Sequence, residues 1–146
     1  MLSKLVATGL GTGFSPVAPG TAGSLFILVI YGLIPEIKIY YFLPGVVVLF
    51  FVGVGSATQA EKEYGPDASV INIDEIVGML ITLMALEKTW LVMAAGFFLF
   101  RLFDVVKLFP IDHLQKLPRG WGIMMDDVVA AVYANLGVRL IWKLMN

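Results

Sequence analysis

Long stretches without a charged residue most constrain what this chain can fold into. No charge lies between Lys4 and Glu36, and the next uncharged stretch is the 22 residues of Ile39–Ala60. A helix needs about 20 mostly apolar residues to cross a bilayer. Pro44 and Gly45 fall inside the second stretch, where a membrane helix tolerates a kink. We therefore predict a transmembrane helix over Ile39–Ala60 in an all-α, polytopic helical membrane protein.

The composition supports a membrane location and narrows the chemistry. Only 14% of the residues are charged and 59% are apolar, whereas about a quarter of an average soluble domain is charged. The formal net charge of −1 leaves no basic excess to bind nucleic acid phosphates. Because there is no cysteine and only one histidine, His113, thiolate and multi-imidazole metal sites are excluded. We expect residues 1–146 to form one helical domain whose chemistry rests on carboxylates, hydroxyls and cations.

The N-terminal segment is rich in glycine and proline. These residues break a helix, so we expect a helix only over Ala22–Ile34, with Thr21 as N-cap and Pro35 as its stop. A cleaved signal peptide is not expected, because Lys4 is the sole basic residue near the start and breakers follow it. The backbone amides and the hydroxyls of Thr12, Ser15, Thr21 and Ser24 form a candidate anion cradle, with Ser15, Thr21 and Ser24 as substrate-binding candidates. The alternative is that the small residues serve close helix packing.

Two short apolar segments follow, Ile76–Leu86 and Trp90–Phe100, and each is too short to cross a bilayer alone. We predict that they form a helical hairpin around residues 76–108, with its turn at Glu87–Thr89. Pro110 is expected to end the second helix. A last apolar helix is expected over Val128–Met145.

Three groups of charged residues are candidates for a functional site. Asp74-Glu75 precedes the hairpin, Arg101, Asp104 and Lys107 share one face of its second helix because they are three residues apart, and Asp126-Asp127 opens the last helix. With a rise of about 1.5 Å per residue, Asp104 returns to the level of Asp74-Glu75. Five carboxylates are therefore expected at one membrane face.

Carboxylates packed closely among apolar residues repel one another unless a cation or protons neutralise them. Because all available ligands are oxygens, Mg²⁺ is the expected partner. The alternative is structural: acids stabilise helix N-termini, and Asp104 can pair with Arg101 or Lys107. Basic loops stay preferentially on the cytoplasmic side, which predicts a cytoplasmic location for the segment 101–119.

The sequence resembles the phosphatidylglycerophosphatase A family, bacterial membrane enzymes that convert phosphatidylglycerophosphate to phosphatidylglycerol. The matching blocks are GTGFSPVAPGTAGSL (11–25), IDEIVGMLITLMAL (73–86), AAGFFLFRLFDVVKLFPI (94–111) and GIMMDDVVAA (122–131). The resemblance implies a lipid phosphatase of the bacterial cytoplasmic membrane that acts with Mg²⁺. The chain departs from the family at Leu108, where a proline is usual, and at Arg119-Gly120-Trp121-Gly122, where Gly-Gly-x-Gly is usual.

The resemblance also implies roles for individual residues. Glu75, Asp104, Asp126 and Asp127 are expected to hold Mg²⁺. Lys107 and Arg101 are expected to stabilise phosphate charge, and Asp74 is expected to act either as a general base or as a group that supports the metal ligands from outside. A phospho-aspartyl intermediate remains an alternative to direct attack by water. The rival from another class is a small ion or proton transporter that uses buried carboxylates.

Overall fold

The structure, a computed structural model, describes residues 1–145. Throughout this range the regular elements are helical, which confirms the all-α prediction. In chain order they are α1 (Leu2–Ala7), the 3₁₀ helix η1 (Gly9–Phe14), α2 (Pro19–Leu33), α3 (Ile39–Tyr64), α4 (Ile73–Leu83), α5 (Trp90–Val106), α6 (Ile111–Leu114) and α7 (Gly120–Met145).

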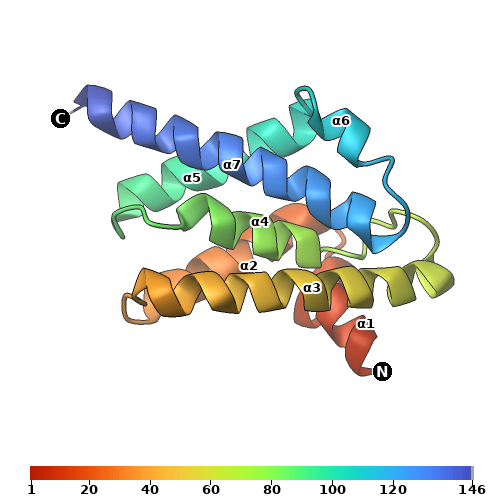
Figure 1. The fold of residues 1–146 in the computed structure, drawn as a ribbon. Helices are drawn as coiled ribbons and strands as arrows, with labels where there is room; N and C mark the ends of the chain where they lie inside the picture. Colours follow the sequence, from red (N-terminus) through yellow and green to blue (C-terminus); the bar gives the residue numbers. More distant parts are fainter. Residues whose placement is uncertain (146) are drawn as a thin grey trace.

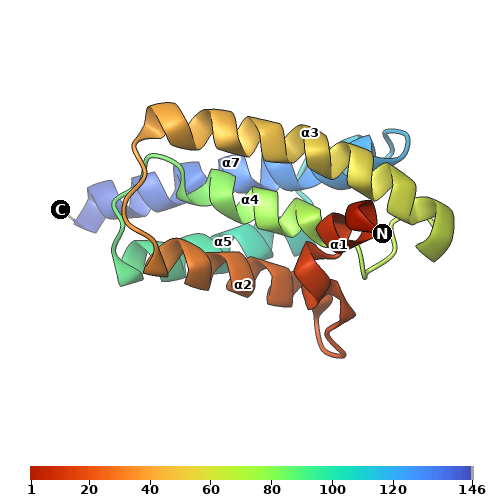
Figure 2. The same cartoon turned by 90° about the horizontal axis from the view of Figure 1, so that it is seen from below.

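The short helix α4 lies at the centre of the bundle. It packs against α2, α3, α5 and α7 (Figures 1 and 2). Most of its side chains are buried, among them Val77, Met79 and Leu83. Groups at the start of α4 are therefore surrounded by the neighbouring helices, although α4 itself is only 11 residues long.

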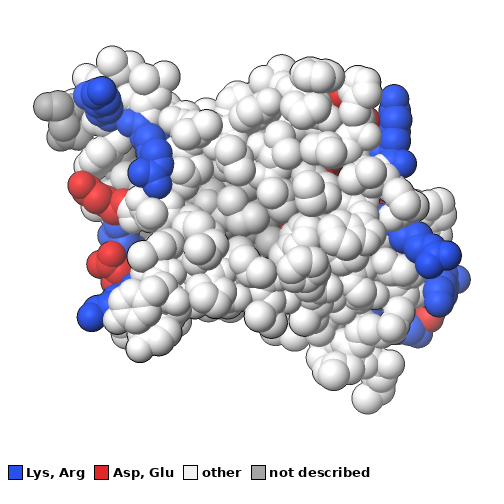
Figure 3. Space-filling view, in the orientation of Figure 1, with Lys and Arg blue, Asp and Glu red and all other residues white. Residues whose placement is uncertain are grey.

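Two helices, α3 and α7, are long and apolar enough to cross a membrane. Each has 26 residues, and the mean hydropathy of its most apolar 18 residues is 2.0 in α3 and 1.4 in α7. Large apolar side chains such as Val48, Phe51 and Leu136 face outward. Figure 3 shows charged side chains gathered at the two ends of the bundle with an uncharged belt between them. Such a belt suits a bilayer, and the molecule is a helical membrane protein.

The N-terminal segment is broken, as predicted, but α2 begins earlier than the sequence suggested. Its first residue is Pro19, and the N-cap is Ala18 in a left-handed conformation (φ 46°), so the prediction of Thr21 as N-cap is wrong. Proline suits the first helical position because its φ is preset and its missing N–H needs no partner there. The helix ends at Leu33, one residue before the expected end at Ile34, and Pro35 follows its C-cap.

The predicted hairpin of α4 and α5 is present, but its turn is longer than Glu87–Thr89, because α4 already ends at Leu83. The hydroxyl of Thr89 caps α5 and accepts a hydrogen bond from the Val92 N–H. Pro110 does not end α5: the helix stops at Val106.

The start of α7 also differs from the prediction. The helix begins at Gly120, so Asp126 and Asp127 lie inside it instead of opening it. Gly120 packs against the backbone of α3, where a Cβ would lie 2.3 Å from the Val54 carbonyl oxygen. Its N–H donates to the Thr58 hydroxyl at 3.1 Å. A glycine that reads as a loop residue in the sequence is thus a point of close helix contact.

A candidate carboxylate site at one end of the bundle

Three carboxylates from two helices meet at the centre of the candidate site. Asp74 and Glu75 lie in the first turn of α4, and Asp127 lies in α7. Oxygens of these three side chains all lie within 4.8 Å of one another. Asp127 is only 2% exposed, so water screens the repulsion among these groups poorly.

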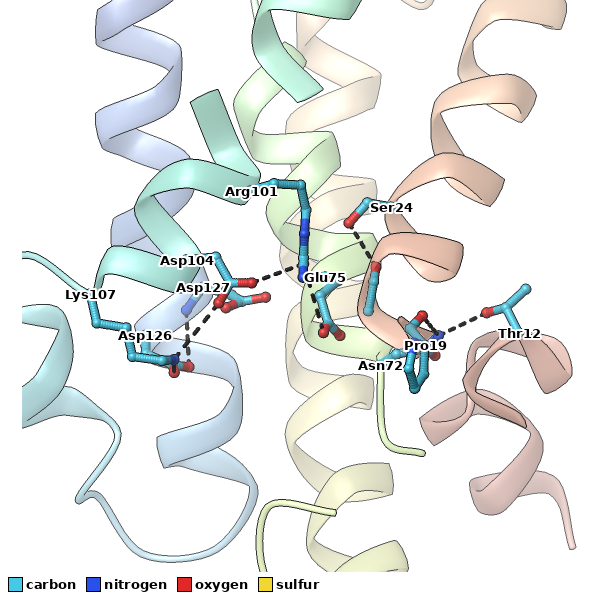
Figure 4. A network of polar contacts seen from close by, with 11 residues as sticks. Thr12, Pro19, Ser24, Asn72, Glu75, Arg101, Asp104, Lys107, Asp126 and Asp127 are labelled. Carbon is cyan, nitrogen blue, oxygen red and sulfur yellow. Dashed lines mark hydrogen bonds and ion pairs between the residues drawn. The ribbon is translucent and has the colours of Figure 1, made fainter. Parts of the chain in front are cut away.

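Two cations border this cluster and hold the other two acids. Arg101 Nη1 lies 2.8 Å from Asp104 Oδ2, and Lys107 Nζ lies 2.7 Å from Asp126 Oδ2. Arg101 Nη1 also lies 3.9 Å from Glu75 Oε1. Figure 4 shows these side chains converging from α4, α5 and α7. The predicted convergence of five carboxylates with two cations is therefore confirmed.

Lys107, which contacts Asp126, has an unusual backbone conformation. It closes α5 in the left-handed region, with φ 48°, which residues other than glycine rarely adopt. Asp126 in turn accepts a hydrogen bond from the Asp127 N–H at 3.0 Å. Strained residues are common at functional sites, so this geometry supports a role for Lys107.

The acid-base properties of the site follow from burial. Asp74 and Lys107 both lie outside the two candidate spans. Burial raises the pKa of Asp74 well above its usual range, and the charges of Glu75 and Asp127 raise it further. Burial lowers the pKa of Lys107, but the hydrogen bond to Asp126 and the negative charges of Asp126, Asp104 and Asp127 together outweigh this effect, so its pKa is raised. Lys107 is thus a cation at neutral pH.

The first turn of α2 lies directly against this cluster. A Cβ at Gly20 would lie 2.0 Å from Glu75 Oε1 and 3.3 Å from Arg101 Nη1, so a side chain would collide with the carboxylate. One turn later, the fully buried Ser24 donates its hydroxyl hydrogen to the Gly20 carbonyl at 3.0 Å. The broken N-terminal segment therefore places a helix N-terminus, which favours negative charge, beside the acids.

The two remaining hydroxyl candidates lie outside the contacts drawn in Figure 4. The Ser15 hydroxyl donates to the Val17 carbonyl at 2.9 Å, in the turn before α2. Thr21 is half-buried in the first turn of α2. Substrate binding by these two residues and by Ser24 stays a prediction.

One residue that the sequence reasoning missed connects the two parts of the site. Asn72 is fully buried directly before α4. Its amide donates to the Thr12 hydroxyl at 2.9 Å and to the Pro19 carbonyl at 3.1 Å. Asn72 thereby fastens the N-terminal segment to the helix that carries Asp74 and Glu75. The sequence did contain a signal for this role: Asn72 is a polar amide between the apolar residues Ile71 and Ile73, just before the acid pair.

The donor set of the central cluster fits a hard divalent cation. Among the described residues, Asp74 Oδ1, Glu75 Oε2 and Asp127 Oδ2 are buried without a hydrogen-bond partner. Buried oxygens without partners are costly, and a cation ligated by carboxylates and water would satisfy all three. Asp104 and Asp126 are less available as metal ligands, because cations lie 2.8 and 2.7 Å from them, whereas Arg101 Nη1 is 3.9 Å from Glu75. Their assignment as metal ligands stays a prediction.

The fold and the site together define a class: a helical membrane protein with a buried carboxylate site at one end of its bundle. Comparison with known proteins identifies the family. The family model of phosphatidylglycerophosphatase A matches residues 5–142. The chain belongs to the phosphatidylglycerophosphatase A family, which is a family of phosphatases, and the resemblance of its motifs is confirmed. This result favours an enzyme over the transporter considered above.

Curated relatives agree on a phosphatase and differ in the lipid that they name. Two are named phosphatidylglycerophosphatase A. The protein from Escherichia coli is 40% identical, over 88% of this chain and 76% of its own length, and the one from Haemophilus influenzae is 38% identical, over 92% and 85%. A Bacteroides thetaiotaomicron protein, provisionally named phosphatidylinositol-3-phosphatase, is 42% identical over 91% of this chain and 89% of its own length. No solved structure matches the chain significantly.

Proposed function

We propose that this chain is a Mg²⁺-dependent phosphatase that hydrolyses the terminal phosphomonoester of phosphatidylglycerophosphate to give phosphatidylglycerol. The observation that carries the proposal is the set of unpartnered oxygens of Asp74, Glu75 and Asp127 beside two cations. Membership of the phosphatidylglycerophosphatase A family supports the lipid substrate.

In this proposal the central carboxylates hold the metal. Asp74, Glu75 and Asp127 would be its protein ligands, with Asp104 and Asp126 as further candidates. When bound, Mg²⁺ supplies charge stabilisation at the phosphoryl group and lowers the pKa of water. No thiolate or imidazole competes for the site, because the chain has no cysteine and its one histidine is in α6.

The cations and the helix N-terminus bind and orient the phosphate. Lys107 and Arg101 would donate to phosphoryl oxygens, which carry the charge that develops during the reaction. The N–H groups in the first turn of α2 would face the same anion. These contacts come from two separate helices, α5 with its C-terminal cap and α2, so they hold the phosphate from two sides.

A carboxylate beside the phosphate would act as the base. We propose that Asp74 accepts a proton from the attacking water through the carboxylate oxygen that does not ligate the metal, because Asp74 lies in the central cluster beside Glu75 and Asp127. The water oxygen bonds to phosphorus while the bond from phosphorus to the glycerol oxygen breaks. The proton that Asp74 accepted passes to the glycerol oxygen, so that the lipid alcohol and inorganic phosphate leave.

The membrane topology that we propose is also open to test. The site end of the bundle carries Lys107, Lys116 and Arg119. Because basic loops are retained on the cytoplasmic side, we place this end and the site at the cytoplasmic face of the bacterial inner membrane. Labelling of a single introduced cysteine at Lys116 in intact cells and in inverted vesicles would measure this orientation.

The decisive experiment measures phosphate release from purified protein in detergent. Phosphatidylglycerophosphate is supplied with Mg²⁺ or with EDTA, beside Glu75→Gln as a control. We expect metal-dependent release that the variant lacks. Absence of metal-dependent release would contradict the proposed enzyme.

The Bacteroides relative's name supplies a second candidate substrate, phosphatidylinositol 3-phosphate. Both lipids carry a phosphomonoester on the head group, so the same site chemistry serves either. We expect the higher kcat/KM for phosphatidylglycerophosphate when the two are assayed side by side. Faster hydrolysis of the inositol lipid would overturn the proposed substrate and leave the phosphatase intact.

A further inference from the structure

The end of α4 opposite the carboxylates is also held by α7. Helix α4 stops at Leu83 inside the bundle, so its last carbonyl groups have no partner within the helix. The Asn135 amide of α7 donates to the carbonyls of Thr82 at 2.8 Å and Met84 at 2.9 Å. Hydrogen bonds thus join the two helices at this end.

Arg139, one turn further along α7, completes the contact. Its Nε donates to Asn135 Oδ1 at 2.8 Å, which orients the amide toward α4. Its Nη2 donates to the carbonyls of Met84 at 3.2 Å and Ala85 at 3.0 Å. We call Asn135, Arg139 and the carbonyls that they bind the α4 clamp. The amide oxygen and nitrogen of Asn135 are both used, so the side chain has one defined orientation.

The clamp and the acid cluster lie on the same pair of helices. Figure 1 shows α4 and α7 running in the same direction from the site end. Glu75 and Leu83 are eight residues apart in α4, and so are Asp127 and Asn135 in α7. At about 1.5 Å per residue, the clamp lies roughly 12 Å from the cluster along each helix. Hydrogen bonds at one end therefore set the axial register at the other.

We infer that Asn135, oriented by Arg139, is a positioning residue for the carboxylate site: it holds α4 in register with α7, so that Asp74 and Glu75 face Asp127. This inference rests on the proposed function, because it concerns the metal site of that reaction. Asn135 contacts no site residue in the described structure. Loosening the clamp should weaken metal binding more than phosphate binding, because Arg101 and Lys107 come from α5 and its C-terminal cap.

The test compares two substitutions at the same level of the bundle. Asn135→Leu removes the interhelix donor with little change in size. Thr82→Val is the matched control, because the buried Thr82 hydroxyl donates only within α4, to the Gly78 carbonyl at 2.9 Å. Asn135→Gln retains a donor and tests rescue. For each protein, kcat, KM and the Mg²⁺ concentration for half-maximal activity are measured.

We expect Asn135→Leu to raise the half-maximal Mg²⁺ concentration at least about fivefold, with KM for phosphatidylglycerophosphate within about twofold of wild type. Thr82→Val should leave the Mg²⁺ requirement within about twofold of wild type, even if it lowers the unfolding temperature, and Asn135→Gln should restore part of the loss. Equal Mg²⁺ requirements in Asn135→Leu and Thr82→Val would overturn the inference, because Asn135 would then only stabilise the fold.

A readout without metal or substrate separates this inference from the proposed function. Hydrogen exchange of the metal-free protein should show faster exchange at residues 73–76 in Asn135→Leu but not in Thr82→Val. Unchanged exchange there would overturn the inference whatever the enzyme does. If Asn135→Leu does not fold, Arg139→Gln is measured instead, because Arg139 is exposed and its substitution should be tolerated. The same changes are expected with a smaller magnitude. Unchanged exchange and Mg²⁺ requirement in that variant would also overturn the inference.

Discussion

At one end of α4, buried oxygens of Asp74, Glu75 and Asp127 lie close together without hydrogen-bond partners. At the other end of the same helix, Asn135 and Arg139 of α7 donate hydrogen bonds to the C-terminal carbonyls, which have no partner within α4. Both ends bring polar groups of α4 and α7 together among apolar side chains. Only at the first end do buried carboxylate oxygens lack hydrogen-bond donors. Such oxygens can bind a cation.

The contrast teaches that polar groups within a membrane protein do not all indicate a site. Buried groups that satisfy one another stabilise the architecture, whereas buried groups of like charge left without partners require a ligand. The next four predictions test this contrast, in order of decreasing effect.

Loss of a central carboxylate should have the largest effect. Asp127→Asn and Glu75→Gln should each lower kcat/KM about a thousandfold, since a metal contributes several kcal/mol to the transition state. The unfolding temperature without metal should stay the same or rise, because like-charge repulsion falls. Activity assays and thermal unfolding with and without Mg²⁺ measure both quantities.

The exposed acid Glu63, which pairs with Lys4, provides the matched control for these two variants. Glu63→Gln should retain full activity. A central variant that keeps most of its activity would show that its carboxylate is no ligand.

Removal of the Lys107 cation should have the next largest effect. Lys107→Met should lower kcat/KM about 10- to 100-fold, which corresponds to loss of a charge-assisted hydrogen bond to phosphate. The loss should fall mainly on KM, and the Mg²⁺ requirement should change little. A raised Mg²⁺ requirement with unchanged KM would instead indicate that Lys107 acts on the acids alone.

A methyl group at Gly20 should have a moderate effect. The Cβ in Gly20→Ala would displace the Glu75 carboxylate, and we expect kcat/KM to fall about tenfold through misplacement of the reacting groups. Gly45→Ala in α3 is the matched control, because a Cβ there has nothing within 4 Å. Equal activity of the two variants would contradict the close approach of α2 to the site.

The exposed ion pair should have the smallest effect. Lys4 and Glu63 lie at the bundle's surface, with about half of each side chain exposed. Water and salt screen such pairs, so Lys4→Ala should leave activity and unfolding temperature unchanged within error. A clear loss of activity would show that the first helix takes part in substrate binding.

Several elements of the site followed from local patterns in the sequence. The three-residue spacing of Arg101, Asp104 and Lys107 predicted a shared face, and both cations do contact Asp104. The helix rise placed Asp104 at the level of Glu75, and Arg101 bridges the two. Such arithmetic works because helix period and rise are constant.

The starts of the helices were harder to predict. Gly120 and Pro19 looked like loop residues, yet each begins a helix. Glycine and proline have ambiguous meaning in a sequence: proline suits the first turn of a helix, and glycine suits a close contact between helices. The choice depends on a neighbouring helix that the local sequence does not describe.

The sequence by itself determined the membrane character, the helical class, the family motifs and the acids available for a site. Only the tertiary structure decided that Asp74, Glu75 and Asp127 each keep a buried oxygen without a hydrogen-bond partner, while Asp104 and Asp126 lie in close ion pairs with Arg101 and Lys107. It also brought together Asn72 with Pro19 and Asn135 with Met84. The physical reason is that helix period and hydropathy depend only on residues near one another in the chain. These pairings depend instead on how helices that are distant in the chain pack and are oriented against one another.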